Sequence, residues 1–202
     1  MRVGLFVTCL VDMMRPRIGF ATLRLLEAAG CEVVVPNTQT CCGQPGWNSG
    51  DRTSARALAL KFIGEFEACD YVVIPSGSCT GMIRTHYAKV FEGDDAALAR
   101  VTAVAQRTRE LTEFLTEVLR VDQVAGKFSG SVTYHDSCSG LRELGIKQQP
   151  RALLAKLLNV TLKEMPECET CCGFGGTFSV KFGEISSEMA ANKCANIRQS
   201  DT

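Results

Sequence analysis

The chain has 202 residues, of which 46% are apolar and 22% are charged, and its formal net charge is zero. This composition is ordinary for a globular protein with one large or two small hydrophobic cores. The balance of charge, with no basic stripe and no acidic tail, gives no sign of nucleic-acid binding or of a disordered tail. No apolar stretch approaches the roughly 18 to 20 residues that span a bilayer, so we expect no transmembrane segment.

Strand-like and helix-like segments alternate along the chain. We expect strands at residues 3–8, 31–36, 70–75, 131–135 and 160–165, and helices at residues 20–27, 54–67, 98–119, 151–158 and 184–199. The first apolar run is too short for a signal sequence and is soon followed by charged residues, so we interpret it as a buried strand. The alternation predicts an α/β fold with parallel strands, whose ligand sites lie beyond the carboxyl ends of the strands.

Eleven cysteines are many for a chain without a secretory signal. The number is odd and the chain is large enough to fold without cross-links, so a disulfide framework is the poorer interpretation. Loops are expected at residues 40–46 and 171–176, and a turn at residues 76–79 places Cys79 at the carboxyl end of the third strand. These cysteines are better explained as metal ligands or redox groups of a cytoplasmic protein than as disulfides.

One cysteine pattern occurs twice. Cys9 is separated by 31 residues from Cys41-Cys42-Gly43, and Cys138 is separated by 32 residues from Cys171-Cys172-Gly173. The copies are offset by 129 and 130 residues, which predicts a duplication into two lobes, residues 1–126 and residues 127–202.

Thiolates that recur at fixed spacing indicate soft-metal binding or thiol redox chemistry. The candidates in the first lobe are Cys9, Cys41, Cys42 and Cys79, and those in the second lobe are Cys138, Cys171 and Cys172. Glycines beside them let the backbone approach a bulky iron–sulfur cluster. Structural zinc more often takes close Cys-x-x-Cys pairs, a form that Cys168 and Cys171 have, so a zinc-stabilised binding module stays open. A thiol–disulfide reductase that uses the Cys-Cys pairs also stays open.

Other residues near the motifs have less specific interpretations. We expect Cys31, Cys69 and Cys194 to be small buried apolar residues. His135 either hydrogen-bonds a loop carbonyl or acts on a bound cluster, whereas His86 is expected on a helix surface. Trp47 either covers the first cysteine site or packs in a core. No hydrolase constellation and no flavin or nicotinamide signature is evident.

The first cysteine pattern, followed by Ser78-Cys79-Thr80-Gly81-Met82, resembles the cysteine-rich (CCG) domain. That domain occurs in heterodisulfide reductase and in iron–sulfur subunits of glycolate and glycerol-3-phosphate oxidoreductases. The segments from His135 to Gly145 and from Cys171 to Phe178 are most similar to the lactate utilization protein A subfamily. The resemblance extends over essentially the whole chain.

The resemblance implies a cytoplasmic iron–sulfur protein that transfers electrons in the oxidation of L-lactate, a 2-hydroxy acid, to pyruvate. It implies one or two [4Fe-4S] clusters on the seven motif cysteines, which we expect to be lost in air. It also implies two partners, both lactate-utilization proteins, one of them an iron–sulfur protein.

Two features depart from the wider family. Met82 replaces the last residue of a Cys-x-x-Cys motif, which favours a simple [4Fe-4S] site over a non-cubane double cluster. Repeating the first lobe's 36-residue gap after Cys172 would put a fourth cysteine near position 209, beyond Thr202. We therefore expect the second lobe to lack its last strand and its fourth ligand, or to have its site completed by a partner.

Overall fold

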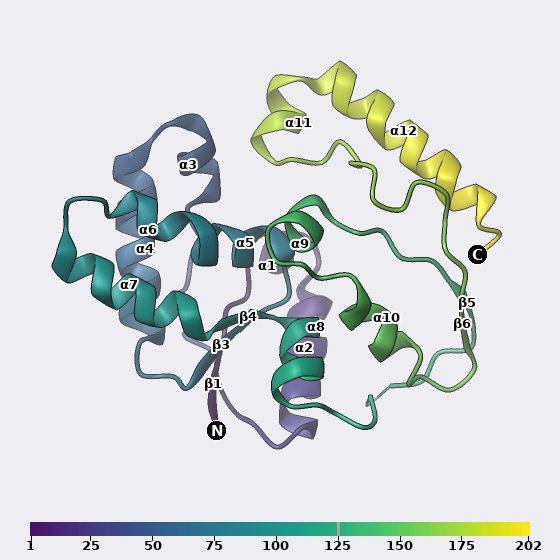
Figure 1. Ribbon diagram of the computed structural model, residues 1–202, viewed down its shortest axis with the longest axis horizontal. Helices are drawn as coiled ribbons and strands as arrows, with labels where there is room; N and C mark the ends of the chain where they lie inside the picture. Colours follow the sequence, from purple (N-terminus) through teal and green to yellow (C-terminus); the bar gives the residue numbers. More distant parts are fainter. Residues whose placement is uncertain (125) are drawn as a thin grey trace. The chain divides into compact units, whose positions relative to one another are not determined.

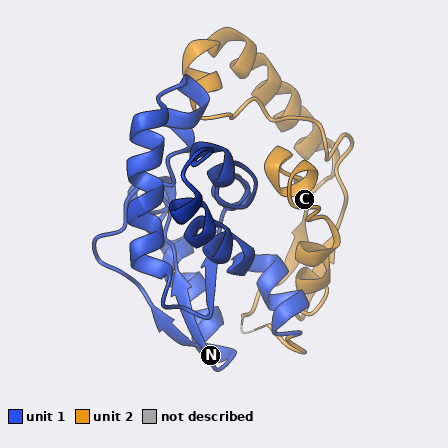
Figure 2. Cartoon of the chain, turned by 60° about the vertical axis from the view of Figure 1, so that its left-hand side comes forward, with its two compact units in different colours: residues 1–120 blue, residues 121–202 orange. Residues whose placement is uncertain are grey.

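The computed structural model describes residues 1–124 and 126–202, which form two compact units. Unit 1 comprises Met1–Arg120 and unit 2 comprises Val121–Thr202, coloured blue and orange in Figure 2. The lobe boundary expected at residue 126 lies a few residues further along and stays a prediction.

Unit 1 is built on a parallel sheet with the strand order β2-β1-β3-β4. The strands are β1 (Arg2–Leu5), β2 (Glu32–Val34), β3 (Tyr71–Ile74) and β4 (Thr108–Glu110). The central strands are short apolar runs because both faces of the sheet are covered, and Val72, Val73 and Ile74 are all buried. The sheet confirms the expected α/β class with parallel strands.

Helices cover both faces of this sheet. They are α1 (Cys9–Met14), α2 (Pro16–Ala28), α3 (Gln44–Ser49), α4 (Arg52–Phe66), α5 (Gly77–Gly81), α6 (Tyr87–Val90), α7 (Asp95–Arg107) and α8 (Leu111–Glu113), with π-helical segments η1 (Met82–His86) and η2 (Phe114–Val118). In Figure 1, α4 and α7 lie on one side of the sheet and α2 on the other. Crossovers between parallel strands are almost always right-handed. The chain moves across the sheet in one direction from β1 to β2 and in the other direction from β2 to β3, so the helices before and after β2 cover opposite faces.

An aromatic core lies under α4. The ring of Phe6 is 5.1 Å from that of Phe62 and 5.9 Å from that of Phe66, both edge-on. Such edge-to-face pairs add to the free energy gained by burying the rings. The same core contains the buried side chains of Cys42 and Cys79, so it reaches the carboxyl ends of the strands.

Unit 2 has a smaller framework. Its parallel sheet pairs β5 (Gly130–Val132) with β6 (Val160–Leu162). Its helices are α9 (Cys138–Arg142), α10 (Gln148–Leu154), α11 (Thr177–Lys181) and α12 (Gly183–Gln199). Of its described apolar side chains, only Ile146, Pro150, Leu153 and Met165 are buried.

Several local predictions were wrong. The strands expected at residues 131–135 and 160–165 end at Val132 and Leu162, and α3 begins at Gln44 within the loop expected at residues 40–46. Three further differences lie in unit 1. The helix expected at residues 98–119 is interrupted by β4, because Thr108 to Glu110 pair with the edge of β3 and so satisfy backbone groups that would otherwise be unpaired. The strand expected at residues 3–8 ends at Leu5, and Thr8 caps α1 instead. The turn expected at residues 76–79 is the start of α5, capped by Ser76.

No helix in residues 1–124 or 126–202 is both long enough and apolar enough to cross a membrane.

Candidate functional site

The four motif cysteines of unit 1 lie beyond the carboxyl ends of three neighbouring strands. Cys9 follows β1 as the first residue of α1, Cys79 lies in the first turn of α5 after β3, and Cys41 and Cys42 lie in the loop after β2. Because parallel strands end at the same edge, these segments bring their cysteines together. The structure thus places all four first-lobe candidates side by side.

The four thiols lie close enough to interact in series, as a chain of neighbouring thiols. Cys9 contacts Cys41, Cys41 contacts Cys42, and Cys42 contacts Cys79. Cys42 and Cys79 are buried, at 2% and 9% exposure, whereas Cys9 and Cys41 are partly exposed. One side of the thiol chain is therefore embedded in the core and the other side faces outward.

The loop that carries Cys41 and Cys42 is fixed by side chains that sequence reasoning missed. Gln39 accepts a hydrogen bond from the Val7 N–H at 2.6 Å and donates to the Pro36 carbonyl at 2.9 Å, which ties the loop to the end of β1. The buried hydroxyl of Tyr87 donates to the Cys42 carbonyl at 2.9 Å. In the sequence, the only indication of the role of Gln39 was its closeness to the Cys-Cys pair, and no feature indicated the role of Tyr87.

Gly43 completes this loop. Its backbone φ is +83°, a conformation that residues other than glycine adopt only at a cost in free energy. A Cβ at this position would lie 3.3 Å from the Ala55 carbonyl oxygen. In this conformation the Gly43 N–H donates to the Cys41 sulfur at 3.4 Å. The motif glycine therefore directs a hydrogen bond at a thiol of the site.

Mutual contact separates the pKa values of the four thiols. The hydrogen bond from Cys42, with help from the Gly43 N–H and against the effect of burial, lowers the pKa of Cys41 to about 5. Burial and the charge on Cys41 raise the pKa of Cys9 to about 11. Hydrogen bonding with Cys41 and Cys79 raises the pKa of Cys42, and hydrogen bonding with Cys42 lowers that of Cys79. Metals bind cysteines as thiolates. Binding a metal to all four cysteines would therefore release the thiol protons that are now hydrogen-bonded to neighbouring thiolates.

Unit 2 brings together the three second-lobe candidates. Cys138 begins α9 after the capping residue Ser137, as Cys9 begins α1 after Thr8. Burial raises the pKa of the Cys138 thiol, as do a hydrogen bond with Cys171 and the proximity of Cys172. The two units therefore repeat the same local design.

Gly173 holds the second Cys-Cys loop as Gly43 holds the first. Its φ is +82°, and its N–H donates to the Cys171 sulfur at 3.5 Å. A Cβ here would lie only 2.5 Å from the Ser186 carbonyl oxygen of α12. The second loop therefore fits more closely against its supporting helix than the first one does.

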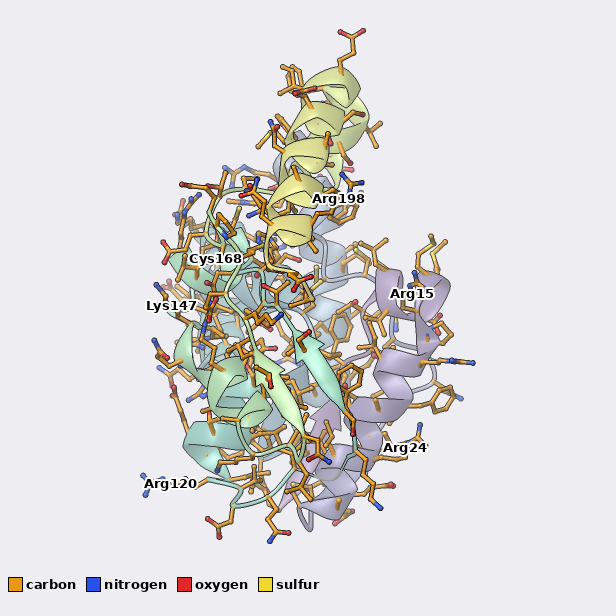
Figure 3. All side chains as sticks on the ribbon, turned by 90° about the vertical axis from the view of Figure 1, so that its right-hand side faces the viewer. Arg15, Arg24, Arg120, Lys147, Cys168 and Arg198 are labelled. Atoms are coloured by element: carbon orange, nitrogen blue, oxygen red, sulfur yellow. The ribbon has the colours of Figure 1, made fainter. Side chains whose placement is uncertain are left out.

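Cys168 has a different environment from the motif cysteines. Burial and a hydrogen bond to the Asp136 carboxylate raise the pKa of its thiol, which favours the protonated form. His135 hydrogen-bonds through Nδ1 to the Cys168 carbonyl at 3.0 Å, the structural role that was one of its two expected roles. Figure 3 labels Cys168 and, near it, Lys147. Cys168 thus belongs to a polar network around Asp136.

Other expectations had mixed outcomes. Cys31 and Cys69 are buried as expected, but Cys194 is exposed, because α12 buries only a narrow face. Trp47 packs against the core, with its ring 5.7 Å from that of the half-buried His86, so the core interpretation of Trp47 holds.

The motif thiols are the donor set that the candidate site offers to a metal. In the part of the chain that the structure describes, no three His, Cys, Asp or Glu side chains are placed around one point to hold a metal ion. The ligands of a cluster bind different iron atoms, so they need not converge on one point. Thiolate donors with a backbone N–H directed at a sulfur are typical of iron–sulfur sites. The site is therefore compatible with a metal cluster.

Comparison with known proteins gives a consistent result. The cysteine-rich (CCG) domain matches residues 3–84 and 132–202, one segment in each unit. Proteins named lactate utilization protein A from a Geobacillus species, Bacillus cytotoxicus and Anoxybacillus flavithermus are each 45% identical to this chain over 199 residues. Each match covers 98% of this chain and 83% of the relative. The chain belongs to the cysteine-rich (CCG) domain family.

Proposed function

We propose that this protein is the iron–sulfur subunit of a multiprotein oxidoreductase that oxidises L-lactate, or a similar 2-hydroxy acid, to pyruvate. The observation that carries the proposal is the continuous chain of four thiols at the sheet edge of unit 1. The name of the relatives, lactate utilization protein A, supports the substrate.

The residues proposed to hold a [4Fe-4S] cluster in unit 1 are Cys9, Cys41, Cys42 and Cys79. When bound, such a cluster stores and passes on one electron at a time. The protein's own part is to shield and orient it. Burial of Cys42 and Cys79 keeps water from one side, and the Gly43 N–H stabilises negative charge on the Cys41 sulfur.

A second site is proposed in unit 2 on Cys138, Cys171 and Cys172. Three thiols leave one position of a cluster for another donor, so we expect this site to load less completely in the isolated chain. Cys168 is not proposed as the fourth donor, because its thiol is engaged with Asp136.

The proposed partners are two further lactate-utilization proteins, one of them an iron–sulfur protein, in the cytoplasm. The partly exposed thiols Cys9 and Cys41 leave one side of the first site open toward such a partner. Electron transfer between proteins requires a redox group near the surface, and this arrangement meets that requirement.

The test is anaerobic reconstitution with iron and sulfide, followed by iron and sulfide counting and EPR spectroscopy of the reduced protein. We expect a [4Fe-4S] signal that Cys41→Ala reduces to the smaller contribution of unit 2 and that Cys69→Ala leaves unchanged. Cys69 is a matched control because it is a buried cysteine outside the thiol chain. Zinc without iron would contradict the proposal in favour of a binding module. Disulfide reduction by metal-free protein would favour a thiol–disulfide reductase.

A further inference from the structure

A cavity of about 490 Å³ opens in unit 1 beside the thiol chain. It lies between α1, α2 and the segment from β2 to the Cys41 loop, and its lining includes both Cys9 and Cys41. Its volume falls within the range of about 300 to 1,000 Å³ that is usual for small-molecule sites. A ligand in this cavity would therefore lie against the two exposed thiols of the candidate site.

The wall of the cavity is mainly apolar. Leu5 and Val7 from the end of β1 and Met13, Phe20 and Leu23 from the two helices line it. Phe20 is 62% exposed and Met13 is 76% exposed, unusual for side chains of this size. The cavity therefore offers apolar surface that a bound molecule could cover.

Few polar groups in the lining remain available to a ligand. Gln39 is one of them by position, but its amide is already bound to the backbone at Val7 and Pro36. Thr40 and Asn37 are exposed and offer a hydroxyl and an amide as hydrogen-bond donors. Asp12 supplies the carboxylate of the lining.

The charge of the lining argues against a hydroxy acid in this cavity. Its described lining residues include no Lys, Arg or His, and Asp12 would repel another carboxylate. Carboxylate ligands are usually held by cationic side chains or by clusters of N–H groups. Lactate or pyruvate therefore does not suit the cavity.

We propose that the cavity binds a quinone-type molecule, a flat apolar ring with carbonyl oxygens that accept hydrogen bonds. The apolar wall suits the ring and its substituents, and Thr40 and Asn37 suit the carbonyl oxygens. The role of such a ligand as an electron acceptor beside Cys9 and Cys41 rests on the proposed function. Binding itself does not, because the cavity is formed by the protein alone.

The test uses ubiquinone-1, whose fully substituted ring offers no open position for thiol addition, and metal-free protein labelled with carbon-13 in its methionine methyl groups. Met13 lines the cavity, whereas its neighbour Met14, 69% exposed, does not. We expect a saturable shift of the Met13 methyl signal on titration and a much smaller shift for Met14. Equal shifts for both, or no saturation, would overturn the proposal.

A pair of variants on α2 tests whether ubiquinone-1 binds in the cavity. Phe20→Asp should weaken ubiquinone-1 binding at least tenfold, because it puts a charge into the apolar wall. Ile18→Asp is the matched control, since Ile18 is an exposed apolar residue of the same helix outside the lining. Equal weakening in both variants, or displacement of the quinone by lactate or pyruvate, would contradict a quinone site.

Iron content separates this proposal from the proposed function. Phe20→Asp should reconstitute with as much iron as the unmodified protein, because Phe20 is not a ligand. Full iron loading without saturable quinone binding would defeat this inference and leave the proposed function intact. Quinone binding by a protein that never forms a cluster would defeat the proposed function and leave the binding site intact.

Discussion

Unit 1 and unit 2 carry the same cysteine pattern on different supports. In unit 1 the Cys-Cys loop rests on an aromatic core, and Cys42 and Cys79 are part of that core. In unit 2 the described buried apolar side chains are only Ile146, Pro150, Leu153 and Met165. Most of the fully buried apolar side chains of the described chain are therefore in unit 1.

Polar contacts take the place of that core around the second site. Asp136, with a fully buried side chain, binds Arg151 through both oxygens at 2.8 Å, and Arg151 also binds Glu164. The Asp136 N–H donates to the Cys168 carbonyl at 3.1 Å, which ties this network to the loop before Cys171. The comparison shows that one motif can be positioned by apolar packing or by buried charge. We therefore expect different perturbations to destabilise the two Cys-Cys loops.

The largest expected difference concerns iron. Cys79→Ser removes one of four thiols from the site that we expect to load most readily, so it should abolish most of the iron bound by the isolated chain. Cys138→Ser affects a site with three thiols and should have a smaller effect. Iron and sulfide counts after anaerobic reconstitution measure both. Equal losses would indicate a shared cluster or another donor in unit 2.

The next effect is on the stability of unit 2. Arg151→Met should destabilise this unit by about 3 to 5 kcal/mol, because it leaves the buried Asp136 charge without its partner. Lys147→Met is the control. Its ion pair with Glu169 is exposed, at 43% and 49%, and should be worth at most about 1 kcal/mol. Urea unfolding of the full chain measures both, and similar losses would contradict the importance of the buried pair.

A smaller effect compares the two motif glycines. Gly43→Ala and Gly173→Ala should each cost about 1 to 2 kcal/mol from the positive φ alone. Gly173→Ala should cost more, because its Cβ would lie 2.5 Å from a backbone oxygen, against 3.3 Å at Gly43. Thermal unfolding of the two variants tests the order. A larger effect at Gly43 would show that the second loop yields more easily than its packing indicates.

The smallest effect is on acid stability. Burial raises the pKa of Asp136, but the hydrogen bonds and charge of Arg151 outweigh it and hold that pKa below its ordinary value. A lowered folded-state pKa stabilises the fold above the unfolded value of about 3.9, and this contribution is lost as pH falls through the folded value. Unit 2 should therefore lose stability below about pH 4. In Arg151→Met, where burial is opposed only by the hydrogen bond from Cys168 and the charge of Lys147, this acid loss should shrink or reverse, as urea unfolding at several pH values would reveal.

The sequence predicted the parts of the fold that depend on local pattern. The apolar runs at β1 and β3 and the apolar spacing of α4 mark buried elements directly, and Cys9 and Cys79 were correctly placed after strands. The segment from Thr108 to Glu110 was misassigned because it is polar and becomes a strand only by pairing with β3. Local pattern does not contain that long-range pairing.

The site was predictable as a set of cysteines but not as an arrangement. Repetition grouped the motif thiols, whereas the engagement of Cys168 with Asp136 depends on how the loop before Cys171 folds against the segment that follows β5. Tyr87 was missed for the same reason, since it is 45 residues from the carbonyl that it binds. Such contacts carry no spacing signal in a single sequence.

The anchor of the first Cys-Cys loop is electrically neutral. The Gln39 amide both accepts from Val7 and donates to Pro36, and neither of these bonds involves an ionisable group. Protonation and dissolved salt therefore have little effect on this anchor, in contrast to the neighbouring Thr38, which binds the ionisable side chains of Lys61 and Glu65. Changes in ionic strength that weaken the ion pairs of unit 2 should leave the contacts of Gln39 with the end of β1 in place, so the first loop keeps one attachment that does not depend on charge.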